Sequence, residues 1–79
     1  MPKRMVHLIF PTKLIKEPVI FTMAKKCDVI PNIRRAKITE TVGEMTLELS
    51  GTKENLEKGM KYLERTGVKV EPLVGDIIE

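Results

Sequence analysis

The chain of 79 residues is long enough for one domain and too short for two. Hydrophobic residues make up 42% of it and charged residues 32%, a balance typical of a globular protein and not of a disordered or collagen-like one. The net charge of +3 divides into +6 on residues 1–40 and −3 on residues 41–79, which favours the pairing of two copies over the attraction of nucleic acid. A single cysteine, Cys27, excludes an intramolecular disulfide and a cysteine-built metal site, so we expect a reducing, cytoplasmic setting.

Neither a signal peptide nor a membrane span is predicted, because the apolar run over residues 5–10 is short and contains His7. A core this small supplies only about 3–5 kcal/mol of net stability, so we expect two copies to form a homodimer. Glutamine and tryptophan are absent while lysine and glutamate are abundant, a usage reported for hyperthermophilic proteins.

The first strand is predicted over residues 5–10, which alternate between two faces. Leu14 and Ile15 are expected to enter the core from the connection that follows. A helix should begin near Pro18, because proline suits the first helical position and disfavours helical geometry at Glu17. Apolar residues at helical spacing form its packed face: Val19, Ile20, Met23, Ala24 and Cys27.

A turn is predicted over residues 28–31 and a second strand over residues 32–41. The spacing between the apolar residues Ile33 and Ala36 breaks strict alternation, which predicts a bulge near Arg34. Residues 41–44 should form a hairpin connection in which Gly43 takes a positive φ. Residues 45–50 then alternate between apolar and polar, the pattern of a half-buried strand.

Thr52 predicts the N-cap of a second helix, Gly59 a close approach on its packed side, and Gly67 its end. A fourth strand follows over residues 68–73, with Pro72 indicating a sheet edge. The order predicts an α+β, ferredoxin-like β-α-β-β-α-β two-layer sandwich, in which both helices cover one face of a four-stranded antiparallel sheet. We expect function on the open face, whose residues include His7, Ile9, Thr46, Glu48 and Ser50. The expected core spans residues 5–73, and residues 74–79 form a tail.

Four stretches in this order, VHLIF, KEPVIFTMAKKCDVIPNIRRAKI, GEMTLELSG and LEKGMKYLERTGVKVEPL, resemble the NIL domain, a relative of the ACT-type amino-acid-binding domains. The most specific pieces are Glu17-Pro18, Asn32-Ile33, Gly43, Ser50-Gly51 and Gly67-Val68-Lys69-Val70. NIL domains stand at the C-terminus of the ATPase subunit of bacterial methionine importers and beside ferredoxin domains in archaeal proteins. Here Arg34 occupies the third position of the Asn-Ile-Leu triplet in the family's name.

The resemblance implies a regulatory domain that dimerises through its sheet and binds methionine or a related amino acid between subunits. Neither a transporter ATPase nor ferredoxin cysteines accompany it, so we expect the regulated protein to be a separate chain. The family's ligand positions correspond to Pro11, Thr12, Lys13, Asn32 and Ile33. Backbone N–H groups, the Thr12 hydroxyl and Lys13 can hold a carboxylate, and the Asn32 amide can bind an amino group. For Asn32 the structural alternative is a turn-forming side chain that satisfies its own backbone.

No catalytic, cofactor or metal site is predicted, and we expect a protein that is not an enzyme. His7 is the only histidine, and Cys27 lies on an apolar helix face. The sequence contains neither of the glycine-rich phosphate-binding patterns GxGxxG and GxxxxGK(S/T). Two alternatives remain open. An RNA-binding module would fit the element order and the pI of about 9.2. Such modules stack bases on aromatic side chains of the sheet, however, and this chain has only Phe10, Phe21 and Tyr62. The other alternative is a structural subunit that docks on another protein through a sheet edge and binds no ligand.

Overall fold

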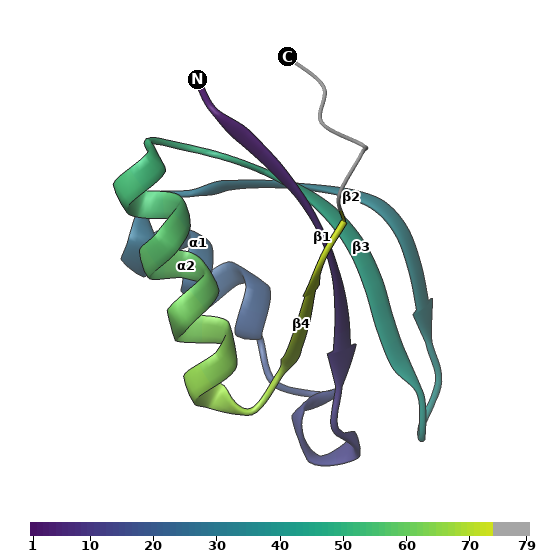
Figure 1. The fold of residues 1–79 in the computed structure, drawn as a ribbon. Helices are drawn as coiled ribbons and strands as arrows, with labels where there is room; N and C mark the ends of the chain where they lie inside the picture. The colour runs from purple at the N-terminus through teal and green to yellow at the C-terminus, as the bar shows by residue number, and fades with distance from the viewer. Residues whose placement is uncertain (74–79) are drawn as a thin grey trace.

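The computed structural model describes residues 1–73 and has the predicted β-α-β-β-α-β order. Its four strands form one antiparallel sheet in the order β2-β3-β1-β4, and both helices lie on the same side of it (Figure 1). The elements are β1 (Lys3–Phe10), the short 3-10 helix η1 (Thr12–Leu14), α1 (Val19–Cys27), β2 (Ile30–Ile38), β3 (Gly43–Ser50), α2 (Lys53–Thr66) and β4 (Lys69–Pro72). The predicted two-layer fold is therefore confirmed.

The core lies between the sheet and the helices. Alternate residues of β1 and β3 point toward the helices, because successive side chains of a strand face opposite ways. Each fully buried aliphatic side chain contributes about 1.5–3 kcal/mol relative to an exposed one. The side chains with almost no exposure are Val6, Leu8, Leu47 and Leu49 from the sheet and Met23, Leu56 and Leu63 from the helices.

The connection between α1 and β2 is shorter than the predicted turn over residues 28–31. Asp28 alone reverses the chain, with a left-handed φ of 57° that a short polar side chain tolerates. Val29 consequently enters the core, where it is 3% exposed, and β2 begins at Ile30. The expectation that β2 would extend to Thr41 was also wrong. The loop over residues 39–42 is closed by the Thr39 hydroxyl, which accepts the N–H groups of Thr41 and Val42 at 3.2 and 2.9 Å.

Gly43 does not take the positive φ predicted for a hairpin. It is the buried first residue of β3 and pairs with Phe10 on one side and Ile38 on the other. A Cβ atom at this position would lie 3.1 Å from both the Phe10 Cβ and the Ile15 Cγ1. A glycine is present here because the side chains of Phe10 and Ile15 leave little room for a Cβ atom. A positive φ in the turn is not the reason.

Helix α2 begins and ends as predicted. The Thr52 hydroxyl accepts the Asn55 N–H at 3.0 Å, and Gly67 ends the helix in a left-handed conformation with φ of 111°. Gly59 lies where the two helices meet, since a Cβ atom there would be 3.1 Å from the Met23 sulfur. That close approach confirms the prediction made from an isolated glycine within a helical pattern.

The two edges of the sheet are β2 and β4. The edge position predicted from Pro72 is confirmed, although β4 covers only Lys69–Pro72 of the expected residues 68–73. Beyond it, the Leu73 N–H still bonds to the Met5 carbonyl at 3.0 Å. Within residues 1–73, no helix is both long and apolar enough to cross a membrane. The predicted tail, residues 74–79, lies outside the described residues.

Candidate functional site

The open face of the sheet, turned away from the helices, is predominantly polar, as predicted. The strand register fixes two rows of side chains across it. One row contains Glu71, His7, Thr46 and Arg35, and the next contains Lys69, Ile9, Glu44 and Lys37. Because neighbouring side chains in such rows lie about 5 Å apart, this face presents closely spaced charges of both signs.

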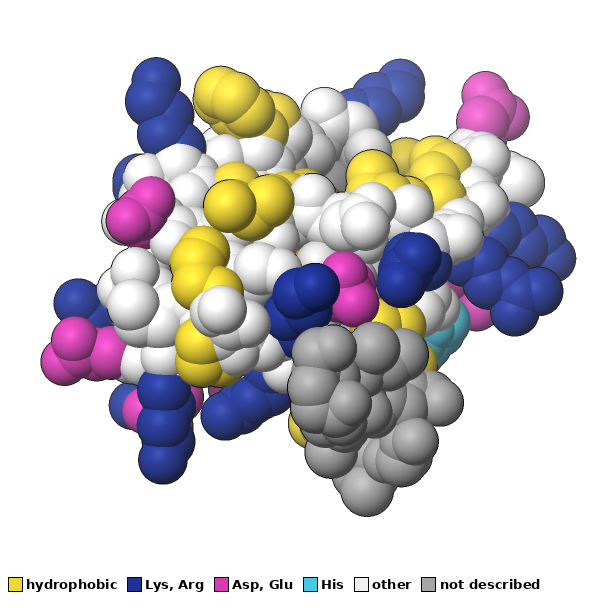
Figure 2. All heavy atoms as spheres, turned by 90° about the horizontal axis from the view of Figure 1, so that it is seen from above, with side chains coloured by type: hydrophobic (Ala, Val, Ile, Leu, Met, Phe, Trp, Pro, Cys, Tyr) yellow, Lys and Arg dark blue, Asp and Glu magenta, His cyan; other side chains and the backbone are white. Residues whose placement is uncertain are grey.

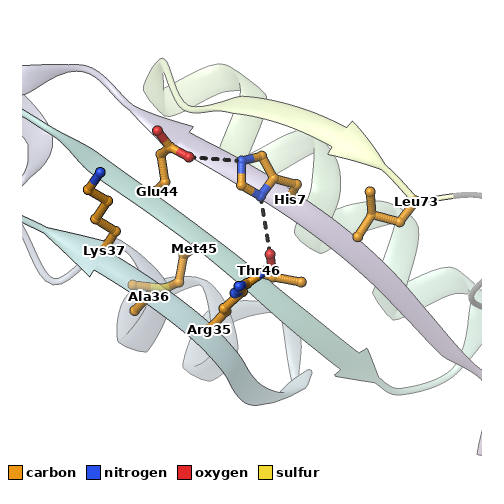
Figure 3. Close-up of a pocket in the computed structure, with 8 residues that line it drawn as sticks. All are labelled: His7, Arg35, Ala36, Lys37, Glu44, Met45, Thr46 and Leu73. Carbon is orange, nitrogen blue, oxygen red and sulfur yellow. Dashed lines mark hydrogen bonds and ion pairs between the residues drawn. The ribbon is translucent and has the colours of Figure 1, made fainter.

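A hollow of about 460 Å³ lies on this face, and we call it the open-face hollow. His7 is held within it by two neighbours on β3 (Figure 3). Its Nδ1 is 3.1 Å from the Thr46 hydroxyl oxygen, and its Nε2 is 3.4 Å from the Glu44 carboxylate. The remaining lining residues are Arg35, Ala36, Lys37, Met45 and Leu73.

Glu48 is buried on the open face, which the sequence did not indicate. Only 7% of the residue is exposed, and its carboxylate lies 3.6 Å from the Arg34 guanidinium. Arg34 is the extra residue of the bulge, which the register shift between Ile33 and Arg35 confirms. Asn32 pairs with Glu48 in the register, so this candidate ligand residue lies beside the ion pair that the buried Glu48 forms with the half-exposed Arg34.

Within one chain the five predicted ligand residues fall into two groups. Pro11, Thr12 and Lys13 follow β1, beside the β2–β3 loop, where the Thr12 hydroxyl donates to the Thr41 carbonyl at 3.5 Å. Asn32 and Ile33 lie near the other end of the sheet. Asn32 shares a row with Met5, five residues from Phe10, which separates the two groups by roughly 17 Å along the strands.

The helix-facing side of β2 is largely uncovered. Ile33 and Ile38 point to the helix side of the sheet, yet they are 54% and 49% exposed. Next to Ile38, an apolar cleft of about 190 Å³ lies between the end of the strand and the start of α1. Seen from above, hydrophobic side chains form several separate patches among peripheral charges (Figure 2). The exposed isoleucines add apolar surface to an edge strand that also carries the exposed cations Arg34, Arg35 and Lys37.

Cys27 is the one cysteine of the chain. Cys27 is half-buried and packs against the core from α1. Within the part of the chain that the structure describes, no three histidine, cysteine or acidic side chains come together in an arrangement that could hold a metal ion.

Comparison with known proteins places the chain in a family. The NIL domain family model matches residues 4–72. The Methionine import ATP-binding protein MetN 2 of Acinetobacter baylyi is 37% identical over 68 residues, a match covering 81% of this chain and 20% of that protein. The chain thus spans about a fifth of the length of that relative.

A solved structure gives the same result for the fold. The crystal structure of the C-terminal domain of an ABC transporter/ATP-binding protein from Enterococcus faecalis superposes with a TM-score of 0.82. The match covers 92% of this chain and 86% of that one, at 23% sequence identity. Since the family model spans nearly all of the described residues, the chain belongs to the NIL domain family.

Proposed function

We propose that this NIL domain is a regulatory module without catalytic activity, which binds an amino acid, methionine or a related one, at an interface between two copies. The observation that carries the proposal is the edge strand β2, where Ile33 and Ile38 remain about half exposed. An edge strand with exposed apolar side chains is suited to pairing with another strand. The kinship with a methionine import ATPase supports methionine as the first ligand to test.

Pairing of β2 with the same strand of a second copy would also assemble the predicted ligand site. In an antiparallel pair related by a two-fold axis, the start of one strand lies beside the end of the other. Asn32 of one copy would then approach the end of β2 in the partner, where Pro11 and Thr12 lie. Residues 11–13 and residues 32–33 lie far apart within one chain, and a ligand site shared between two copies would bring one group from each copy together.

The polar groups at this interface suit an amino acid. Lys13 and the Thr12 hydroxyl lie at the first of the two groups and offer a positive charge and a donor for a carboxylate. The adjacent cleft lined by Ile15, Ile20 and Ile38 offers an apolar surface for a side chain. Ligand binding would stabilise the dimer, and the dimer would report amino-acid supply to a separate partner protein.

Thermal unfolding with and without methionine tests the proposal. At a concentration about tenfold above Kd, the ligand adds about 1.4 kcal/mol of stability, which raises Tm by several degrees in a domain of this size. The variant Asn32→Ala should show a clearly smaller increase, because it loses the contribution of the interface site, and Asn55→Ala, an asparagine on α2, should keep the full increase. Equal increases in both variants would contradict the assigned site, and no increase with any common amino acid would contradict the function.

A structural subunit that docks through β2 without a ligand is the second candidate, favoured by the same exposed isoleucines. It predicts a dimer whose Tm no amino acid changes. RNA binding has less support. Phe10 is buried beneath the helices, and Phe21 and Tyr62 belong to α1 and α2, so no aromatic side chain lies on the open face where bases would stack.

A further inference from the structure

The open-face hollow separates charges that could pair directly. Lys37 lies opposite Glu44 in the register of β2 and β3, at the spacing of cross-strand ion pairs. The Glu44 carboxylate instead lies beside His7 of the neighbouring strand β1, with 3.4 Å between Oε1 and Nε2. In Figure 3 a dashed line joins one oxygen of this carboxylate to the His7 ring, and none joins the carboxylate to Lys37. Within residues 1–73, Lys37 and Glu44 therefore line the same hollow without forming an ion pair.

Thr46 fixes the ring that holds Glu44. A carboxylate accepts hydrogen bonds and cannot donate them, so a neutral His7 that bonds to Glu44 carries its proton on Nε2. Its Nδ1, 3.1 Å from the Thr46 oxygen, then accepts the hydroxyl proton. The His7 ring thus contacts Thr46 through Nδ1 and the Glu44 carboxylate through Nε2, which places that carboxylate toward β1.

The opposite wall is positive. Arg35 and Lys37 lie on the same face of β2, two residues and about 7 Å apart. The ion pairs among residues 1–73 are His7–Glu44, Arg34–Glu48 and Lys69–Glu71, so neither of these two cations has a carboxylate partner in the described part of the chain. Two cations of β2 and one carboxylate of β3 thus line the same hollow, which Leu73 also lines.

We propose that the open-face hollow is a second ligand site, which binds a small zwitterion such as a free α-amino acid. The carboxylate of the ligand would bind Arg35 and Lys37, and its ammonium group would bind Glu44. The hollow is open to solvent on one side, and its volume of about 460 Å³ is large enough for a molecule of the size of an amino acid. All the lining residues belong to one chain, so this site needs no dimer and goes beyond the interface site proposed above.

An NMR titration of the ¹⁵N-labelled chain with three probes tests the site. L-Methionine carries both charges, L-methioninol lacks the carboxylate, and N-acetyl-L-methionine lacks the ammonium group. Loss of one charge-assisted contact should weaken binding at least about tenfold for each analogue. The amide shifts should centre on β1, β2 and β3 around His7, Thr46 and Arg35.

Two variants separate recognition from mere structural support. Glu44→Gln should weaken methionine binding and strengthen N-acetyl-L-methionine binding, because a repulsive charge is removed. The double variant Arg35→Gln, Lys37→Gln should lose both ligands. Lys69→Gln, on the same face but outside the hollow, is the matched control and should bind as the unmodified chain does. The dispersion of each variant's amide spectrum reports whether it is folded.

Three results would overturn the second site. Shifts confined to Pro11–Lys13 and Asn32–Ile33, and abolished by Asn32→Ala, would leave the proposed function standing and the hollow unused. N-Acetyl-L-methionine binding as tightly as methionine would show an anion site in place of a zwitterion site. No shift with methionine, or with a mixture of the other common amino acids, at about 10 mM each would show that the hollow binds no such ligand.

Discussion

Replacing Ile33 and Ile38, two of the three exposed isoleucines of β2, by threonine should dissociate the proposed dimer. Full burial of an isoleucine contributes about 1.5–3 kcal/mol, and Ile33 and Ile38 keep about half of their surface exposed, so each has about 1 kcal/mol still to gain. A symmetric dimer contains four such side chains, which amounts to about 4 kcal/mol. The dimer Kd of the double variant Ile33→Thr, Ile38→Thr should therefore rise roughly 1,000-fold.

Analytical ultracentrifugation over a concentration series measures this change. Threonine preserves the β-branched shape that a strand favours, so the monomer should keep its fold, which circular dichroism can verify. Ile9→Thr is the matched control, because it makes the same substitution on the central strand β1, away from the edge. A monomeric unmodified chain at about 100 µM, or a double variant whose Kd stays within about threefold, would refute the edge-to-edge interface.

Four further predictions concern stability, and denaturant unfolding measures each. Leu47→Ala should cost about 2–5 kcal/mol, because the side chain is fully buried, and should leave much of the protein unfolded. Gly67→Ala should cost about 1 kcal/mol or more because of its φ of 111°, whereas Gly51→Ala, with ordinary φ and 3.5 Å of clearance, should cost less. Thr52→Ala should cost about 1 kcal/mol and Thr52→Ser almost nothing, since serine keeps the cap. Arg34→Gln should destabilise more than Glu48→Gln, because only the first leaves a buried carboxylate without its cation; the reverse order would show that Arg34 does not support Glu48.

The sequence predicted most of the fold because its local signals agree with one another. Strict alternation over residues 45–50, the Thr52 cap and the glycine at residue 67 each specify one conformation, and the structure adopts all three. The bulge was predictable from apolar spacing alone. Gly43 shows the limit of such reasoning, because a glycine beside a turn has two explanations, and only the positions of Phe10 and Ile15 decide between them.

The candidate sites were less predictable because they depend on neighbours distant in sequence. Alternation placed Glu48 on the open face, but nothing local showed that Arg34 and the adjoining strands would bury it. The contact of His7 with Glu44 and Thr46 depends on the register of β1 against β3, which the sequence leaves open. The uncovered side of β2 likewise depends on where α1 lies over the sheet (Figure 1).

The bulge in β2 connects the two surfaces to which we assign function. If β2 alternated strictly from Ile33 onward, Arg35 and Lys37 would face the helices, and Ile38 would face the open side. The extra residue Arg34 reverses that pattern, so the apolar side chains stay on the helix side of the edge while both cations reach the open-face hollow. Arg34 itself then reaches Glu48, which gives the inserted residue a buried partner. One irregularity in one edge strand therefore contributes to the proposed dimer edge, to the proposed zwitterion site and to the surroundings of the only buried acid within residues 1–73.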